Sequence, residues 1–435
     1  MPLERIKNYY TASANDTKEY PALSTDIKVD VAIIGGGFTG VATALEMVER
    51  GFTVALCEAN RIGWGASGRN GGQVTGSLSG DKAMQAQLEH NKGIDAAEFI
   101  WNLRWRGHDI IREHVARYAI DCDLRTGHLH TAWSEKDVHE LQESVTLAHS
   151  YGMEHDVSWL TKQDVHELLE TPLYFGAIRN NRNMHLHSLN LCLGEARAAH
   201  SMGAQIFEQT SILAIKGKRN PTLLTEMGTV SAKKVVLAGN AYHRLAQKQL
   251  KGRLFPAILG NMTTEPLGDE LANQINKDNV AVYDSRMVLD YYRLTRDNRL
   301  MFGGGTNYSG RSIKNVAETL RPAMVKTFPA LANTKIEYAW SCTAGIVMNR
   351  IPMVGRIDNN LYYAQGYSGH GIATSHLIAE VLAEALTGTL EQFDVFNSFK
   401  HQRIPGGQRV GSSLLALGMW YYQFRERRQS AGREV

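Results

Sequence analysis

The sequence predicts a mixed α/β (α+β) protein whose domains are built from discontinuous segments of the chain. Near the amino end, an apolar strand, a helix and a second apolar strand follow one another, as a parallel βαβ unit requires. Short strands and helices alternate through the rest of the 435 residues. No linker and no repeat divides the chain, so the two or three domains that this length suggests would have to share segments.

The composition is that of an ordinary globular protein, with 43% hydrophobic and 21% charged residues. A formal net charge of +3 is too close to neutral to indicate a nucleic-acid partner. The cysteines are widely separated and form no CxxC pair, which indicates a reducing compartment rather than a disulfide framework. The first residues are polar, and no apolar run reaches the roughly 18–20 residues of a membrane span. We expect a cytoplasmic protein with no transmembrane segment.

The amino-terminal βαβ unit carries a phosphate-binding pattern. "VDVAIIGGG" is a buried strand that ends in glycines, a helical pattern follows from Phe38 to Arg50, and "FTVALCEA" is the second strand. Gly35, Gly37 and Gly40 form G-x-G-x-x-G at the turn. In this pattern the first glycine allows the tight turn, the second lets the backbone approach a pyrophosphate, and the third lets helix and strand pack closely. The helix N-terminus then offers N–H groups to the phosphates.

Glu58 closes the second strand, at the position where an acid binds a ribose 2′-hydroxyl. Strand, helix, strand and acid together predict a dinucleotide site, although a Gly-rich turn with an incidental glutamate would show the same pattern. "KKVVLAGNA" is another buried strand that ends in glycine. The other cofactor-binding residues predicted at these strand ends are Phe38, Thr39, Ala59, Ala238 and Gly239.

A second glycine loop, "GYSGHGIATSHL", opens a helix near the carboxyl end. Its N–H groups could stabilise negative charge on a reduced flavin ring. Such a loop, far along the chain from the first glycines, fits an extended FAD better than NAD, with an NAD-dependent dehydrogenase as the alternative. The cofactor-binding residues predicted here are Gly366, Ser368, Gly369, His370 and Gly371.

The segment "RIGWGASGRNGGQV", residues 61–74, follows the ribose-binding strand. Its glycines allow close approach to a cofactor, Arg69 can neutralise phosphate, and the backbone amides of Asn70 to Gln73 can face the flavin ring. The alternative is a flexible surface loop. The cofactor-binding residues predicted in it are Gly65, Ala66, Ser67, Arg69, Asn70, Gly71, Gly72 and Gln73.

Six stretches together resemble the D-amino-acid oxidase/glycine oxidase-like family of FAD-dependent oxidoreductases, and within it the γ-glutamylputrescine oxidoreductase branch. They are "VAIIGGGFTGVATALEMVERG", "GASGRNGGQV", "VVLAGNAYHRLA", "RLMFGGGTNYSG", "NRIPMVGRI" and "GYSGHGIATSHL". The resemblance implies a Rossmann-like FAD-binding domain over residues 1–95, 190–250 and 341–435. It also implies a substrate-binding domain with a large, mostly antiparallel sheet over residues 96–189 and 251–340.

The resemblance further implies oxidative deamination of a primary amine, with hydride transfer from the α-carbon to flavin N5. Oxygen or another acceptor would then take the electrons, giving hydrogen peroxide if it is oxygen. γ-Glutamylputrescine is the substrate that this branch implies. The alternatives are oxidation of an N-methyl, cyclic or D-amino acid, and a flavin-binding redox sensor without turnover.

One departure from the family bears on the substrate. Glycine-oxidase-like relatives carry W-x-G-x-R-P, whose arginine clamps an α-carboxylate. In "WSCTAGIVMNRIP", Trp340 and Pro352 keep their places, but Ala344 stands where the arginine would be. An α-carboxylate would lose its bidentate partner, which favours an amine with no carboxylate beside the reacting carbon.

The catalytic candidates are His370, Gln73 and Tyr292. His370 and Gln73 lie in the glycine loops expected beside the flavin. The alternative to a catalytic role is a histidine bonded to the backbone for His370 and a structural amide for Gln73. Tyr291 and Tyr292 lie on a strand expected over the flavin, and strand alternation puts them on opposite faces. Sheet packing is the alternative for at least one of these tyrosines.

The substrate-binding candidates are Tyr291, Arg293 and Trp340. Arg293 could meet a glutamyl carboxylate. Arg350 precedes "IPMVG", where the family bends toward the flavin, and is assigned to cofactor binding with a salt bridge as the alternative.

Cys342 lies near the position where sarcosine-oxidase-like relatives attach their flavin. A covalent bond needs thiolate character, so non-covalent FAD is the main expectation and a link to Cys342 the alternative.

Two H-x-H pairs, in "HLHTAW" and "NMHLHSLN", would place both rings on one face of a strand. No further ligands accompany them, so we predict no metal site and read these histidines as structural or solvent-facing. The tail "GSSLLALGMWYYQFRERRQ" is apolar and then basic, which suits a docked helix or a membrane-surface contact.

Overall fold

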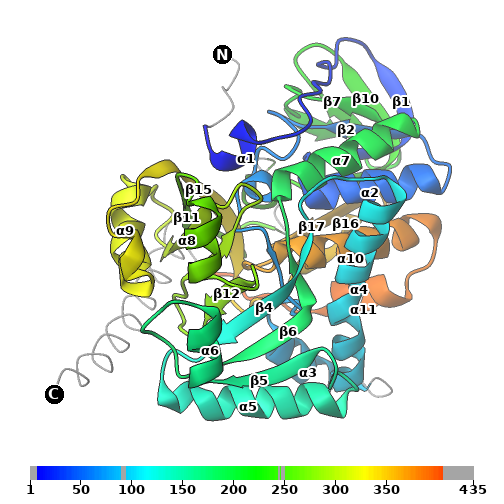
Figure 1. Ribbon diagram of the computed structural model, residues 1–435. Coiled ribbons are helices and arrows are strands. Elements are labelled where there is room, and N and C mark those ends of the chain that lie inside the picture. Colours follow the sequence, from blue (N-terminus) through cyan, green and yellow to red (C-terminus); the bar gives the residue numbers. More distant parts are fainter. Residues whose placement is uncertain (1–6, 90–94, 243–244, 246–249, 405–435) are drawn as a thin grey trace.

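The computed structural model describes residues 7–89, 95–242, 245 and 250–404. Two large sheets with helices packed around them form the molecule (Figure 1). The first sheet has eight strands and the second has nine. The predicted mixed α/β class is confirmed.

The first sheet is mainly parallel. Five neighbouring strands, in the order β17-β10-β1-β2-β7, run in one direction, and β16 and β9 pair antiparallel at its margins. Its strands are β1 (Ile27–Ile34), β2 (Val54–Cys57), β7 (Gln205–Phe207), β8 (Ala214–Lys216), β9 (Thr222–Leu224), β10 (Thr229–Leu237), β16 (Met353–Asp358) and β17 (Leu361–Gln365).

A layer of helices covers one face of the first sheet. It consists of α2 (Phe38–Glu49), α7 (Ser188–Ser201), α10 (Gly371–Thr387) and α4 (Ala96–Arg117), each in contact with a neighbour. Nearly every side chain of α2 is buried, because this helix lies between the sheet and two other helices. The layer and the sheet share one apolar core.

The second sheet is mostly antiparallel, as predicted. Its order is β15-β11-β14-β13-β12-β4-β6-β3, with β5 beside β6, and β12–β4 is its parallel pair. Its strands are β3 (Gln73–Val74), β4 (Arg125–Thr131), β5 (Val157–Thr161), β6 (Gly176–His185), β11 (Leu254–Thr264), β12 (Ala281–Asp284), β13 (Tyr291–Leu294), β14 (Leu300–Asn307) and β15 (Ile336–Val347).

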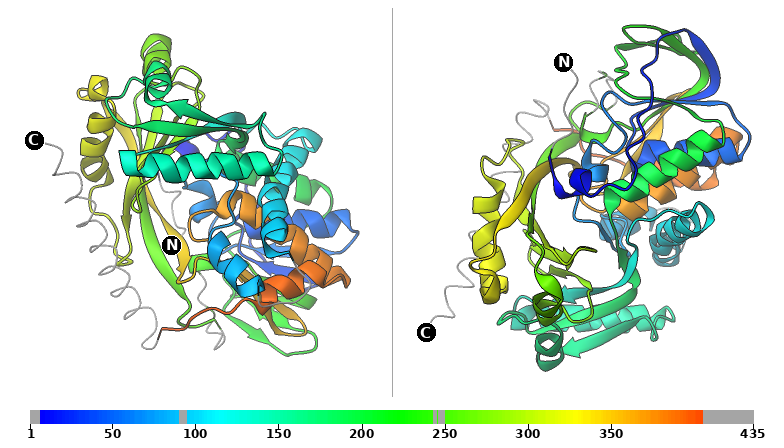
Figure 2. Two further views of the ribbon diagram at one scale, coloured as in Figure 1. Left: turned by 90° about the horizontal axis from the view of Figure 1, so that it is seen from below. Right: turned by 45° about the horizontal axis from the view of Figure 1, so that its top comes forward.

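The two faces of the second sheet have different partners. On the outer face, Leu129, Val282 and Phe302 belong to a core shared with α6 (Lys162–Leu168), α8 (Gly268–Ile275) and α9 (Val316–Thr327). Figure 2 shows α9 along this outer side. The inner face is turned toward the first sheet, so segments between the two sheets can form a site. The remaining helices are α1 (Tyr9–Ala12), α3 (Asp81–Leu88), α5 (Glu135–Ser150), α11 (Glu391–Ser398) and the short 3-10 turns Ala66–Gly68, Asn240–Tyr242 and Pro329–Leu331.

The sheets do not follow the predicted domain ranges strictly. β3 and β15 belong to the second sheet, although β3 lies within residues 1–95 and β15 crosses residue 341. The division into domains stays a prediction. The carboxyl-terminal tail lies outside the described residues. Along the described part of the chain, no helix combines the length and apolar character needed to cross a membrane.

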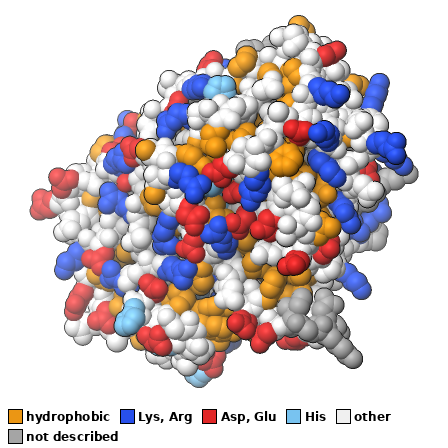
Figure 3. All heavy atoms as spheres, turned by 90° about the vertical axis from the view of Figure 1, so that its right-hand side faces the viewer, with side chains coloured by type: hydrophobic (Ala, Val, Ile, Leu, Met, Phe, Trp, Pro, Cys, Tyr) orange, Lys and Arg blue, Asp and Glu red, His pale blue; other side chains and the backbone are white. Residues whose placement is uncertain are grey.

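The face formed by α4, α10 and α11 carries charges of both signs, which Figure 3 shows interspersed. Several of them are paired: Arg106 of α4 pairs with Glu380 of α10, and Arg117 of α4 pairs with Glu49 at the end of α2. The Arg106–Glu380 pair ties α4, which leads into the second sheet, to α10 in the helix layer of the first sheet.

A buried His–Glu–His network joins three helices of this layer. Glu195 Oε1 lies 2.9 Å from His114 Nδ1 and 2.8 Å from His376 Nε2. His376 Nδ1 lies 2.6 Å from the Ile372 carbonyl, so that nitrogen carries a proton. Burial alone would raise the pKa of the Glu195 carboxyl, but the charge of His376 and hydrogen bonds from both histidines lower it to about 2. The network therefore carries charge inside the helix layer.

These three side chains are also of metal-ligating types, and their ligand atoms lie within 4.8 Å of one another. The hydrogen bonds between them account for this arrangement. The expected absence of a metal site stays a prediction.

We predict that Glu195→Gln destabilises the protein by about 3–5 kcal/mol, because it removes the carboxylate between two buried histidines. Burial lowers the pKa of His114, but the hydrogen bond to Glu195 and the charges of Glu195, Glu46 and Glu49 together outweigh it, so the pKa is raised from 6.5. The stabilisation from His114 is therefore complete below pH 6.5 and is lost as the pH rises through the raised folded-state pKa. Urea unfolding of wild type and variant between pH 6 and 9 measures both effects.

The control is Glu143→Gln, which alters an exposed His–Glu pair on α5 and should change the free energy of unfolding little. Equal stability of Glu195→Gln and wild type would contradict the account of the network.

Candidate functional site

The carboxyl ends of four parallel strands meet at one edge of the first sheet. β2, β1, β10 and β17 are neighbours and run in the same direction. In open α/β sheets, ligands bind in the crevice outside such strand ends. The predicted cofactor segments follow these ends directly, namely residues 35–40, 58–59, 238–239 and 366–371.

The β1–α2 turn is a cradle that admits only glycine at key points. Gly35 has φ +115°, and a Cβ there would lie 2.8 Å from the Ala238 carbonyl oxygen. A Cβ on Gly40 would lie 1.9 Å from the Gly35 carbonyl oxygen. Gly37 precedes α2 and provides no side-chain cap. The turn therefore brings bare backbone and a helix N-terminus to the strand ends, which is an anion-binding arrangement.

Glu58 is fixed beside this turn by backbone amides. Its Oε2 accepts the Gly36 N–H at 2.7 Å, and its Oε1 accepts the Asn60 N–H at 2.8 Å. Burial raises the pKa of the carboxyl, against the lowering effect of these bonds. The side chain remains half-buried, at the strand end where the sequence predicted a ribose-binding acid.

The loop Gly65–Gln73 runs from the first sheet to the second and is docked there through its carbonyl groups. The Arg69 carbonyl accepts hydrogen bonds from Trp340 Nε1 at 2.9 Å and Asn261 Nδ2 at 3.3 Å. The Gly71 carbonyl accepts one from Arg293 Nε at 3.0 Å. Backbone carbonyls of the loop thus bind side chains on the inner face of the second sheet.

Asn70 shapes the loop from within. Its Nδ2 donates to the Ala66 and Ser67 carbonyls, both at 3.0 Å. Its Oδ1 accepts the Gly72 N–H at 2.7 Å and the Ser188 hydroxyl at 2.6 Å. The amide is fully used in holding the turn, which explains why an asparagine stands there.

Two buried guanidinium groups flank the loop. Arg69 stacks on Trp64, 4.6 Å from its ring, and donates to the Tyr242 hydroxyl at 2.9 Å. Arg293 is 1% exposed and donates to the Leu186 carbonyl at 2.8 Å. Among the described residues, neither forms an ion pair with a carboxylate. Buried charges are usually paired, so two uncompensated cations beside the loop suit an anionic ligand.

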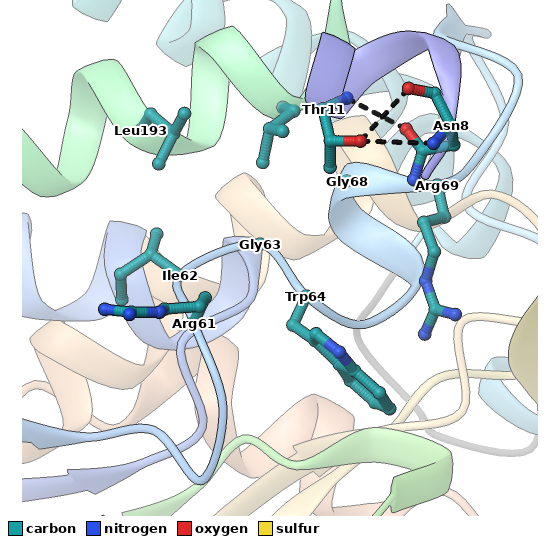
Figure 4. A pocket seen from close by; sticks show the side chains of 10 residues that line it. Asn8, Thr11, Arg61, Ile62, Gly63, Trp64, Gly68, Arg69 and Leu193 are labelled. Carbon is teal, nitrogen blue, oxygen red and sulfur yellow. Dashed lines mark hydrogen bonds between the residues drawn. The ribbon is translucent and has the colours of Figure 1, made fainter. Parts of the chain in front are cut away.

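A small hollow lies behind the loop, between it, α1 and α7 (Figure 4). Leu193 of α7 lies on one side of it, and Trp64 and Arg69 lie on the opposite side. Leu189 of α7 also lines the hollow. The Asn8 and Thr11 side chains cap each end of the first turn of α1 reciprocally, as the dashed lines show. The amino-terminal segment thus closes the back of the loop.

The second glycine loop, residues 366–371, contains strained backbone. Ser368 in this loop has φ +51°, and Arg350, which precedes β16 and contacts the loop, has φ +65°; non-glycine residues seldom adopt such values. Arg350 Nη1 contacts the Ser368 carbonyl at 3.4 Å. His370 Nδ1 is buried with no hydrogen-bond partner in the described part of the chain. A bound group at the strand ends would account for this orphaned nitrogen.

Residues 30–385 match the DAO family, described as FAD dependent oxidoreductase. The chain belongs to this family. It is 39% identical to the γ-glutamylputrescine oxidoreductase of Escherichia coli (strain K12), over 98% of this chain and 99% of that protein. It is 34% identical to the probable oxidoreductase OrdL of Haemophilus influenzae, over 97% of each chain.

Solved structures show the same fold. Glycine oxidase from Geobacillus kaustophilus aligns with a TM-score of 0.71 at 22% identity, covering 86% of this chain and 99% of that one. L-proline dehydrogenase from P. horikoshii aligns with a TM-score of 0.71 at 20% identity, covering 86% and 97%. The predictions of family, fold class, oxidoreductase activity and FAD as cofactor are confirmed.

The structure separates the two neighbouring tyrosines of this flavoenzyme as alternation predicted. Tyr291 packs on the loop, since a Cβ on Gly71 would lie 2.3 Å from its ring. Tyr292 lies in the outer core, its ring 5.0 Å from that of Phe328 and its hydroxyl 3.3 Å from that of Tyr174. This placement favours packing over catalysis for Tyr292.

Two other predicted site residues are held in place by the protein itself. Gln73 Nε2 donates to the Val282 and Tyr292 carbonyls, at 3.1 and 3.2 Å, so its amide anchors the loop to the second sheet. The guanidinium of Arg293 donates its hydrogen bonds to carbonyl groups and to the Tyr10 hydroxyl. This arrangement favours a role in positioning the loop over contact with a glutamyl carboxylate. Their assigned roles stay predictions.

Cys342 lies near the loop, in surroundings that favour the protonated thiol over the thiolate. The side chain is buried, and burial raises the pKa of its thiol to about 11. The thiol is therefore protonated at neutral pH, which favours non-covalent FAD.

Sequence reasoning missed three residues that hold the loop: Tyr10, Tyr242 and Asn261. Each contacts Arg69 or Arg293 from a distant part of the chain. No local pattern marks them, because their partners are set by the arrangement of the sheets.

We predict that Gly35→Ala lowers FAD affinity at least about tenfold, which corresponds to ~1.4 kcal/mol. The added Cβ would lie 2.8 Å from the Ala238 carbonyl oxygen, and the residue would have to keep a φ of +115°. The ratio of flavin to protein absorbance after dialysis measures retention. Gly51→Ala is the matched control, since Gly51 also has positive φ (+81°) but its Cβ would meet nothing within 4 Å. Full FAD retention by Gly35→Ala would contradict the assignment of the cradle.

Proposed function

We propose that this flavoenzyme deaminates a primary amine with no carboxylate beside the reacting carbon, and that its substrate is γ-glutamylputrescine. The products would be γ-glutamyl-aminobutyraldehyde, ammonia and, with oxygen as acceptor, hydrogen peroxide. The 39% identity to the E. coli γ-glutamylputrescine oxidoreductase supports this substrate. The observation that carries the proposal is that alanine, not arginine, stands at position 344 on the inner face of β15.

Trp340 binds the loop from the inner face of β15, and alternation places Ala344 on that same face. Ala344 pairs across the sheet with Ala257, so two methyl groups stand side by side there. An α-amino acid would need a guanidinium fork for its carboxylate, and neither Ala344 nor its partner Ala257 supplies one. The nearby Arg69 guanidinium is engaged by the Tyr242 hydroxyl and the Ser341 carbonyl. A primary amine needs no such partner.

We propose that residues 35–40 receive the pyrophosphate of FAD, Glu58 a ribose hydroxyl, and the loops 65–73 and 366–371 the flavin ring. Bound there, FAD supplies the two-electron acceptor for oxidation of the carbon–nitrogen bond. The backbone N–H groups at the N-terminus of α10 stabilise negative charge at this position.

The amine must lose its ammonium proton before it can be oxidised. Burial lowers the pKa of His370, so its imidazole is neutral at neutral pH. We propose His370, whose Nδ1 is buried with no hydrogen-bond partner among the described residues, as the group that receives this proton, with the positive surroundings lowering the pKa of the ammonium. Hydrolysis of the imine by water releases ammonia and the aldehyde.

The test is anaerobic reduction of the visible flavin spectrum by γ-glutamylputrescine, putrescine, sarcosine and a D-amino-acid mixture, offered separately. We expect rapid bleaching with γ-glutamylputrescine and at least about tenfold slower bleaching with the amino acids, because each loses a charge-assisted bidentate contact. Faster bleaching by an amino acid would show that a carboxylate clamp lies elsewhere. No bleaching with any amine would favour the redox sensor.

A further inference from the structure

One H-x-H motif has two histidines with different surroundings. His128 is 1% exposed, and its Nε2 lies 2.7 Å from the Met184 carbonyl, which is a structural role. His130 on β4 is half-buried and stacks on half-buried Tyr283 of β12. The ring centroids are 4.4 Å apart and the planes differ by 22°. Two polar rings thus remain accessible in the middle of a nine-stranded sheet.

The strand registers place this pair in a row that begins at the glycine loop. Tyr291 faces Tyr283 across β13 and β12, and Tyr283 faces His130 across β12 and β4. Tyr291 packs on Gly71, so the row starts at the loop and crosses the inner face away from it. Neighbouring strands lie about 4.8 Å apart, which puts His130 about 10 Å from Tyr291 along the sheet.

This distance fits an acylated four-carbon amine. In γ-glutamylputrescine, eight bonds separate the reacting carbon from the α-carbon of the glutamyl group. At about 3.8 Å for three bonds in an extended chain, they span about 10 Å. With the reacting carbon beside the loop, the glutamyl group would reach the His130–Tyr283 pair.

We propose that the His130–Tyr283 pair receives the distal acyl arm of the amine and makes the enzyme prefer acylated amines to free diamines. This proposal rests on the proposed function and deepens it. Burial lowers the pKa of His130 to about 4, so the ring is neutral and offers one donor and one acceptor. Amide and carboxylate groups suit such a partner.

A free diamine would bring a second ammonium to the same place. Neither neutral ring compensates a buried positive charge. Asp137 is the carboxylate whose charge acts on His130, but its Oδ2 is held by the Ser134 N–H and the Ser285 hydroxyl. The far end of the row therefore offers neutral hydrogen-bonding groups that suit an amide better than a second ammonium.

The test compares wild type with His130→Ala in steady-state oxidation of γ-glutamylputrescine, N-acetylputrescine and n-butylamine. We expect KM for γ-glutamylputrescine to rise up to about tenfold with kcat nearly unchanged, since hydrogen bonds to the distal arm are lost. The kcat/KM for n-butylamine, which has no distal arm, should stay within about twofold of wild type. His139→Ala, at an exposed histidine on α5, is the matched control and should change neither value.

Equal loss for γ-glutamylputrescine and n-butylamine, or no loss for either, would overturn the proposal. If His130→Ala does not retain FAD, His130→Phe decides by the same comparison, because it keeps a ring beside Tyr283 but loses both hydrogen-bonding nitrogens. If the wild type oxidises γ-glutamylputrescine but the variants lose no more activity on it than on n-butylamine, this inference alone is refuted. Absence of wild-type turnover refutes the proposed function and this inference with it.

Discussion

The site depends on the docking of the loop Gly65–Gln73 through its own carbonyl groups. Asn261 and Trp340 are direct neighbours across β11 and β15, and both donate to the Arg69 carbonyl. Arg293 holds the Gly71 carbonyl from β13. A buried carbonyl without a partner costs about 1–3 kcal/mol, so each bond favours one position of the loop. Because this loop follows the β2 strand end, its docking also sets the distance between the two sheets.

The charge around the loop follows from the same contacts. Arg69 and Arg293 are buried without carboxylate partners among the described residues, and α10 presents its N-terminus to the same strand ends. A positive environment stabilises an anionic cofactor and disfavours a substrate ammonium. An amine is oxidised in its neutral form, so one electrostatic arrangement serves both binding and reaction. Neutral His370 and neutral His130 agree with this arrangement, at the two ends of the proposed substrate path.

Local patterns in the sequence were sufficient to place the predicted cofactor-binding segments at the strand ends. Glycine spacing after β1, Glu58 at the end of β2 and the glycine loop before α10 depend on neighbouring residues, and each is where the sequence placed it. The second half depends on register between strands far apart in the chain. Gln73 was expected beside the flavin, but its amide binds strands β12 and β13. Strand alternation separated Tyr291 from Tyr292, yet it could not show which face meets the loop.

The central claim is that three segments distant in sequence form one FAD site. Hydrogen–deuterium exchange, compared between FAD-free and FAD-loaded protein, tests it directly. We predict that FAD slows exchange together in residues 35–40, 65–73 and 366–371, with little change on the outer face at α9. Protection confined to one of these segments, or centred on other strands, would contradict the account.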